Sequence, residues 1–270
     1  MTLKKADYFL IIVHLLILIF LPFFLSNGGV GGDFGYYIKL ANNLPALDDN
    51  LFPIGFPLFL RLFKSITNEY FYSSLFLKVT CSLFILWHSY KKQFYFREIL
   101  LLMCLKSTVW IFVYQSSEYI SLPFIYLFLY YIHQLFRNKI SSKKFFIIVS
   151  LIGFILCSIR YSNVFIFISS IPFLLFLKHS SKEIKFTLFS TIACIGFLFA
   201  FYLLFNYYTL GSFASENQRV NDEINHFWQD TYVDFIGSNN LSNPFFYLTT
   251  LDYTSTTKMV LSFCCIGIDL

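Results

Sequence analysis

The sequence predicts an all-α protein that is embedded in a membrane through several spanning helices. Of its 270 residues, 57% are hydrophobic and 13% are charged, whereas about 25% of the residues in a soluble domain are charged. The mean hydropathy of the chain is +0.65. Long apolar runs alternate with short polar loops, which is the pattern of a polytopic membrane protein.

Seven apolar runs are predicted to be complete transmembrane helices. They are Tyr8–Leu25, Tyr70–Tyr90, Ile99–Gln115, Ile120–Phe136, Phe145–Ile159, Val164–Leu177 and Phe186–Tyr208. The first exceeds the ~7–15 apolar residues of a signal peptide, and no cleavage site of small residues follows it, so we expect it to be retained. Ile54–Ile66 is too short and, with Arg61 and Lys64, too basic to span. It is predicted to be a re-entrant or interfacial helix.

Basic residues predict how the chain is oriented. Twelve of the 20 lysines and arginines fall in alternate loops: Lys4, Lys5, Lys91, Lys92, Arg97, Arg137, Lys139, Lys143, Lys144, Lys178, Lys182 and Lys185. Because basic loops stay in the cytoplasm, the N-terminus is expected on the cytoplasmic side of the inner (plasma) membrane. The intervening loops, and any active site they carry, are then expected at the outer face.

The same pattern predicts the domain organisation. Residues 1–208 form a transmembrane module, with a first outer loop at 26–53 and the re-entrant or interfacial helix at 54–66. Residues 209–257 form an outer-face segment, and 258–270 begin an eighth span. Its apolar run, Met259–Ile268, is too short to cross a membrane, so we expect the chain to be truncated at its C-terminus.

Several classes of function are disfavoured by composition. The net charge of +5 is spread over short loops rather than gathered on one face, so nucleic acid is not an expected partner. The six cysteines lie in apolar runs without a C-x-x-C pair, which indicates neither a zinc site nor a disulfide framework. No G-x-x-x-x-G-K loop is present, which argues against an energy-driven pump.

The first outer loop contains an amphipathic segment that begins at an acid. Asp33 follows two glycines, and apolar residues then recur at helical spacing: Phe34, Tyr37, Ile38, Ala41 and Leu44. Asp is a favoured helix N-cap, which is one interpretation of Asp33. A general base at the membrane surface is the other.

Three further charged residues have both a structural and a functional interpretation. Glu118 begins a span, where the helix dipole favours an acid, and it is a second candidate catalytic residue. Arg160 either snorkels from a helix end or binds a phosphate with its guanidinium fork. Lys78 and Lys106 lie near the middle of their spans, where ionisable residues are usually functional. Lys78 is included among the candidate substrate-binding residues.

Aromatic residues near the outer boundary also have two interpretations. Tyr37 and Tyr161 belong to this group, together with Tyr36, Tyr114 and Tyr119. An interfacial aromatic belt accounts for them, and so does stacking against a sugar. His14, within the first span, is expected to be packed and hydrogen-bonded, whereas His226 lies in the outer-face segment.

The order of these motifs resembles that of the GT-C superfamily of membrane glycosyltransferases. Asp33, Tyr37 and Ala41 precede a Pro-x-Gly-x-Pro segment at residues 53–57; Ser117-Glu118 and Arg160-Tyr161 each open a later span. The chain looks closest to the bacterial branch that includes protein O-mannosyltransferases and aminoarabinose transferases. The resemblance covers about Tyr8 to Tyr208, and it implies a GT-C-like helical bundle.

The resemblance also implies an activity. It predicts an inverting glycosyltransferase that moves a sugar from a polyprenyl-phosphate donor to a glycan, lipid or protein acceptor. Asp33 matches the first-loop acid that activates the acceptor in this superfamily. Many members carry an acidic pair there, whereas this loop has one acid beside Gly32 and Phe34. No cofactor is specified; a divalent cation remains compatible with the sequence, without assigned ligands.

Two other classes of function remain open. One is a polysaccharide polymerase or ligase of cell-surface glycan assembly. Such enzymes tend to rely on arginines in large outer loops, and Arg219 is the only arginine between Thr209 and Thr257. The other is a non-catalytic transporter or flippase, in which Asp33 would be dispensable.

Overall fold

The computed structural model describes residues 3–24, 32–45, 52–176 and 182–210. Three predicted parts of the chain lie wholly or partly outside these residues. They are the first outer loop (25–31 and 46–51), nearly all of the outer-face segment with Arg219 and His226, and the expected eighth span. Every regular element in the described part is a helix. In chain order these are α1 (Lys5–Phe24), α2 (Gly32–Asn43), α3 (Gly55–Thr67), α4 (Tyr70–Lys92), α5 (Phe96–Cys104), α6 (Lys106–Val113), α7 (Glu118–Phe136), α8 (Ser142–Ile159), the 3₁₀ turn η2 (Tyr161–Asn163), α9 (Val164–Phe176) and α10 (Lys182–Leu210).

Five helices in the described part are long and apolar enough to cross a membrane: α1, α4, α7, α8 and α10. They correspond to five of the seven predicted spans, so the all-helical class is confirmed, with five helices whose length and composition suit a helical membrane protein. Seven complete spans are not, because the other two predicted spans take a different form.

The predicted span Ile99–Gln115 is interrupted in the middle. Leu105 has extended backbone angles (φ −65°, ψ 143°) and separates α5 from α6. No proline or glycine lies at this point, but Lys106, Ser107 and Thr108 put a charge and two hydroxyls there. Lys106 is exposed at the first position of α6 rather than enclosed within a continuous helix.

The predicted span Val164–Leu177 is a short helix. Its described part, α9, has 13 residues and follows the 3₁₀ turn η2. About 20 residues are needed to cross a hydrocarbon core, so α9 alone does not reach that length within the described chain.

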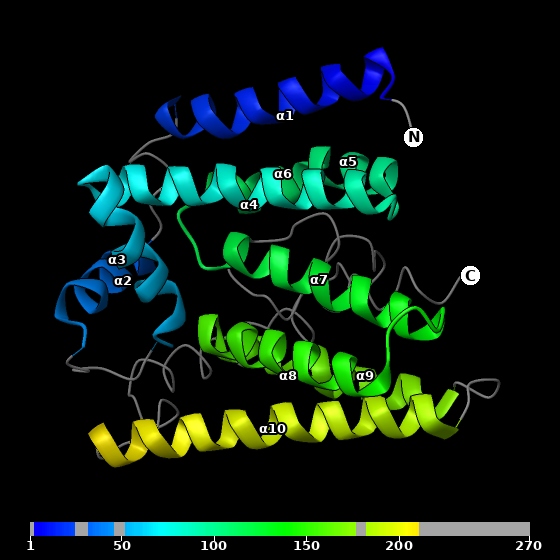
Figure 1. Ribbon diagram of the computed structural model, residues 1–270. Helices are drawn as coiled ribbons and strands as arrows, with labels where there is room; N and C mark the ends of the chain where they lie inside the picture. The colour runs from blue at the N-terminus through cyan, green and yellow to red at the C-terminus, as the bar shows by residue number, and fades with distance from the viewer. Residues whose placement is uncertain (1–2, 25–31, 46–51, 177–181, 211–270) are drawn as a thin grey trace, which may run out of the picture. The chain divides into compact units, whose positions relative to one another are not determined.

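The long helices lie side by side in the order α1, α4, α7, α8 and α10 (Figure 1). α5 and α6 pack against α1, and α9 packs against α10. α2 and α3 cross one end of this row, where α3 contacts both α4 and α8. These two short helices therefore connect parts of the bundle that lie far apart in sequence.

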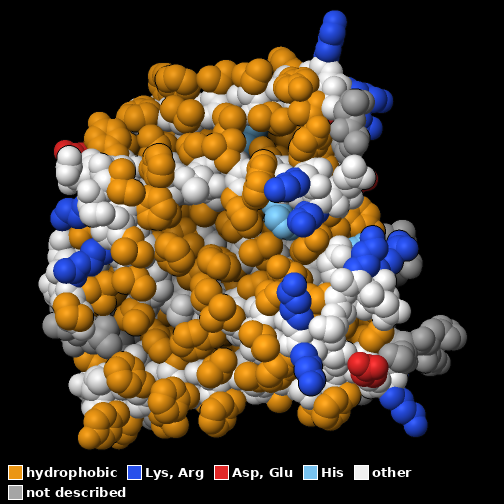
Figure 2. Space-filling model, viewed as in Figure 1, with side chains coloured by type: hydrophobic (Ala, Val, Ile, Leu, Met, Phe, Trp, Pro, Cys, Tyr) orange, Lys and Arg blue, Asp and Glu red, His pale blue; other side chains and the backbone are white. Residues whose placement is uncertain are grey.

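The predicted basic loops gather at the opposite end. The start of α1, the end of α4, the end of α7 and the starts of α8 and α10 all lie there (Figure 1). Figure 2 shows most lysine and arginine side chains of that face near this end, and hydrophobic side chains over the middle. We call the two ends of residues 1–210 the basic end and the α2–α3 end.

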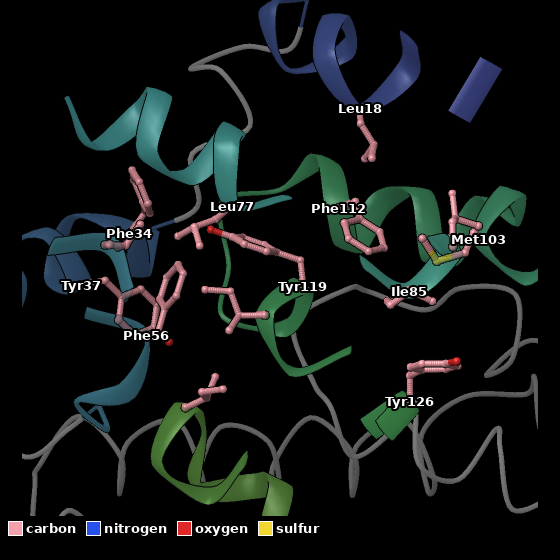
Figure 3. Packing of buried hydrophobic residues seen from close by; sticks show 14 of the residues in the cluster. Leu18, Phe34, Tyr37, Phe56, Leu77, Ile85, Met103, Phe112, Tyr119 and Tyr126 are labelled. Carbon is pink, nitrogen blue, oxygen red and sulfur yellow. The ribbon is translucent and has the colours of Figure 1, made fainter. Parts of the chain in front are cut away.

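α2 and α3 are fixed to the bundle by aromatic packing and by one close backbone approach. Phe56 on α3 lies between Tyr37 and Tyr119, with ring centroids 4.7 Å and 5.7 Å away, in edge-on arrangements (Figure 3). Gly55 touches α8 so closely that a Cβ atom there would lie 2.5 Å from the carbonyl oxygen of Ser158. The Gly of the Pro-x-Gly-x-Pro segment is thus required by packing.

Candidate functional site

Polar side chains form a layer at the α2–α3 end, between the two short helices and the long helices of the bundle. We call this the polar layer; it comprises Tyr37, Ser74, Lys78, Gln115, Ser117, Glu118, Tyr119, Ser121, Arg160, Tyr161, Asn163 and Asn206. Its members come from α2, α4, α7 and α10 and from the α6–α7 and α8–α9 junctions.

Glu118 and Arg160 form an ion pair, in which Arg160 Nη1 donates to Glu118 Oε1. The sequence predicted both as site residues, but not that they pair. Glu118 lies in the first turn of α7, and Arg160 is the extended residue that ends α8. Each side chain is 24% exposed, so the pair lies at the edge of the layer where a ligand can approach it.

A second contact holds the same two junctions together. Asn163, at the end of η2, donates to Ser121 Oγ (3.0 Å) and to the carbonyl oxygen of Leu156 (2.8 Å), and Asn163 and Ser121 are both buried. The carbonyl oxygen of Leu156 also accepts the backbone N–H of Arg160 (3.1 Å), so the Asn163 amide adds a second hydrogen bond that holds η2 against the end of α8. This positions Arg160 opposite Glu118.

Tyr37 brings α2 to the α6–α7 junction. Its hydroxyl lies 3.3 Å from Ser117 Oγ, next to Glu118 in sequence. The buried hydroxyl of Tyr119 lies 2.8 Å from Ser74 Oγ on α4. Both tyrosines are thus built into the layer by hydrogen bonds, rather than lying on the surface as an interfacial belt would.

Lys78 is fully buried and contacts the α6–α7 junction. Its Nζ donates to the carbonyl oxygen of Val113 (2.7 Å) and lies 5.4 Å from the ring centroid of Tyr119. Val113 ends α6, where the dipole and the unpaired carbonyls favour a cation. These contacts give Lys78 a structural role in the layer, and substrate binding by Lys78 stays a prediction.

Tyr161 and α10 complete the layer. Asn206 Nδ2 lies 3.4 Å from the hydroxyl of Tyr161, a long hydrogen bond. On the same helix, the hydroxyl of Tyr202 accepts a hydrogen bond from the backbone N–H of Ile54, just before α3 (3.1 Å). α10 is therefore tied both to the α8–α9 junction and to α3.

Asp33 is the second residue of α2, one turn before Tyr37. α2 begins at Gly32, so Asp33 lies in the first turn, where the helix dipole favours an acid by ~0.3–1 kcal/mol. Its side chain lies outside the described part of the structure. The helix that carries Asp33 is nevertheless the one that contacts Ser117.

Gln115 is a member of the layer that sequence reasoning did not select. Only 2% of this residue is exposed, and neither of its amide atoms has a hydrogen-bond partner among the described residues. In the sequence, Gln115 is the last residue of the predicted span Ile99–Gln115. Its signal was weak, because an amide at a predicted membrane boundary is ordinarily solvated.

Two other findings delimit the site. In the residues that the structure describes, no three His, Cys, Asp or Glu side chains lie together as metal ligands. An apolar pocket lies between α7, α8, α9 and α10, lined by residues such as Phe128, Val149 and Ile192. It includes none of the candidate site residues.

His14, as predicted, is buried and hydrogen-bonded, with its Nε2 2.9 Å from Ser82 Oγ.

Comparison with known proteins finds no family model, no curated protein and no solved structure that matches this chain.

Proposed function

We propose that the protein is an inverting glycosyltransferase, which moves a sugar from a polyprenyl-phosphate donor to a hydroxyl of a glycan, lipid or protein acceptor at the outer face of the membrane. One observation carries the proposal. The helix of Asp33 and the Glu118–Arg160 pair meet in one polar layer, at the end of the bundle opposite the basic loops. A donor whose phosphate lies at the interface and whose tail lies in lipid suits this location.

In the proposed reaction, Asp33 takes the proton of the acceptor hydroxyl. The acceptor oxygen attacks the anomeric carbon of the donor sugar from the face opposite the phosphate. A new C–O bond forms as the bond between the anomeric carbon and the phosphate oxygen breaks. The pair of electrons leaves with polyprenyl phosphate, and the anomeric configuration inverts.

Arg160 is the cation proposed to stabilise the departing phosphate. A guanidinium fork matches phosphate oxygens, and its pairing with Glu118 orients it before the donor arrives. Preorganised charge of this kind commonly supplies a large part of the rate. Glu118 then acts as a positioning residue through Arg160, and Tyr37 and Tyr161 flank the sugar.

Asp33→Asn tests the proposal. Asn can still cap or accept hydrogen bonds in the first turn of a helix but cannot take a proton at neutral pH. Losing the charge should cost at most ~1 kcal/mol of stability. Turnover should fall by ~10²–10⁴ if Asp33 is the general base.

The measurement is sugar transfer from polyprenyl-phosphate sugars by purified wild-type and Asp33→Asn protein, each checked for equal yield and equal unfolding midpoint. Gly35→Ala is the matched control, because a Cβ atom at this position in α2 meets nothing within 4 Å. Transfer at nearly the same rate by Asp33→Asn would remove Asp33 from catalysis.

A further inference from the structure

The α6–α7 junction holds polar groups that the protein itself does not satisfy. Gln115 presents an amide oxygen and an amide nitrogen without a described hydrogen-bond partner, although the residue is almost wholly buried. Three residues later, Glu118 Oε1 accepts from Arg160, while the buried Oε2 has no partner in the described chain.

Most of the buried polar atoms without a hydrogen-bond partner in the described structure lie at the α2–α3 end. Eight buried side-chain nitrogen and oxygen atoms of the described residues lack a hydrogen-bond partner. Five of them belong to Gln115, Glu118, Ser162 and Asn206, at the two junctions and on the neighbouring turn of α10. A buried polar group without a partner costs about 1–3 kcal/mol, so such a cluster indicates a site that is satisfied by a bound molecule.

The chemistry of the unpaired atoms selects the class of ligand. An amide oxygen and a carboxylate oxygen both accept hydrogen bonds, and the amide nitrogen of Gln115 donates. A phosphate bound at these atoms, in addition to the donor phosphate proposed at Arg160, would be repelled by the Glu118 carboxylate. A sugar hydroxyl both donates and accepts, so neighbouring hydroxyls on one ring complement Gln115 and Glu118 together.

We infer that the α6–α7 junction binds hydroxyl groups of the donor sugar, with Gln115 as the specificity-determining residue and Glu118 Oε2 as a second acceptor. The inference rests on the proposed glycosyltransferase function, because it names the sugar subsite of the same layer. The Arg160 edge of the layer is then the phosphate side, and the Gln115 edge is the sugar side.

Both short helices pack against this junction. Tyr37 on α2 lies within hydrogen-bond distance of Ser117, and Phe56 on α3 packs edge-on against Tyr119 (Figure 3). The proposed subsite therefore lies next to α2 and α3. An aromatic ring such as that of Tyr37 can then lie against the sugar face.

The test compares binding of polyprenyl phosphate that carries glucose, mannose, galactose or N-acetylglucosamine with binding of the same polyprenyl phosphate without a sugar. Apparent Kd values come from the ligand-dependent rise in unfolding temperature of the purified full chain. The variants are Gln115→Leu, which replaces the amide by an apolar group of similar size, and Gln115→Asn, which keeps an amide on a shorter side chain. Ser150→Ala is the control, since Ser150 Oγ is likewise buried and unpaired in the described structure but lies on α8, outside the polar layer.

Wild-type protein and Ser150→Ala should bind at least one sugar-bearing donor more tightly than polyprenyl phosphate alone. In Gln115→Leu, the ratio of the Kd for polyprenyl phosphate alone to the Kd for the sugar-bearing donor should fall by about tenfold or more. Without ligand, this variant should have an equal or higher unfolding temperature, because an unpaired amide has been removed. Gln115→Asn should show the same fall in this ratio, which keeps the test decisive if the leucine variant does not fold.

An unchanged sugar-dependent difference in either folded Gln115 variant overturns the inference, and so does the absence of any difference in wild-type protein. The latter result would mean that ordered water, and no sugar, satisfies the unpaired polar groups at the junction. Transfer activity, measured on the same samples, separates the two ideas. Sugar-dependent binding at Gln115 without transfer upholds the subsite and contradicts the glycosyltransferase.

Discussion

Glu118 and Arg160 each lie at the helix end that the sequence predicts, and they also pair with each other. Glu118 does lie at a helix start, where the dipole favours an acid, and Arg160 does end a helix. Each also neutralises the other at the edge of the polar layer, with about a quarter of each side chain exposed. A partly buried charge that loses its partner is costly, so the pair must be tested as a unit.

We expect Arg160→Ala and Glu118→Ala each to destabilise the protein by ~1–3 kcal/mol, less than a fully buried pair because water still reaches both groups. The double variant should lose less stability than the two single variants together, since each single variant already removes the one interaction between the two side chains. Unfolding titrations of the purified variants in detergent would measure this. Strictly additive losses would mean that the two side chains do not interact.

Helix α3 is positioned by features on both of its sides. Arg61 donates to the carbonyl oxygens of Ala41 (3.4 Å) and Leu44, at the C-terminal end of α2, which ties α2 to α3. On the other side, Gly55 allows α3 to approach the backbone of α8. The exposed face of α3 carries Leu58, Leu62 and Ile66 beside Arg61 and Lys64, which suits an interfacial helix.

Three glycine substitutions should separate close approach from helix propensity. In Gly55→Ala, the new Cβ atom meets the backbone at Ser158 and Ile159, which cannot move away without shifting α3, so we expect a loss of ~1–3 kcal/mol. In Gly153→Ala, it meets Cδ1 (2.4 Å), Cγ1 (2.6 Å) and Cγ2 (3.1 Å) of Ile195, a buried side chain branched at Cβ that has little freedom to change rotamer, so we expect a loss of similar size. Gly196→Ala meets nothing within 4 Å and should be neutral or stabilising by up to ~1 kcal/mol. An unfolding midpoint of Gly55→Ala as high as that of Gly196→Ala would contradict the close approach of α3 and α8.

Across the molecule, apolar length was enough to predict five long helices, and helical spacing was enough to predict α2. The break at Leu105 escaped prediction because no proline or glycine marks it, and only Lys106 and the two following hydroxyls interrupt the apolar run. The candidate site was predicted as separate residues. That Glu118 meets Arg160, 42 positions further along the chain, and that Gln115 is buried without a partner, depend on tertiary packing that no local pattern encodes.

The arrangement of charge over the bundle predicts its orientation in the membrane. The basic loops gather at one end in Figure 1, so they should share one side of the membrane, and the positive-inside rule assigns that side to the cytoplasm. Asn43, at the end of α2, and Ser141, just before α8, are both exposed and lie at opposite ends of the bundle. In a background with all six cysteines replaced, a thiol at Asn43 should react with a membrane-impermeant reagent added to intact cells. A thiol at Ser141 should react only after the cells are opened, and equal labelling of both in opened cells is the control. If Ser141 reacts in intact cells and Asn43 does not, the polar layer faces the cytoplasm, and an outer-face transferase is excluded.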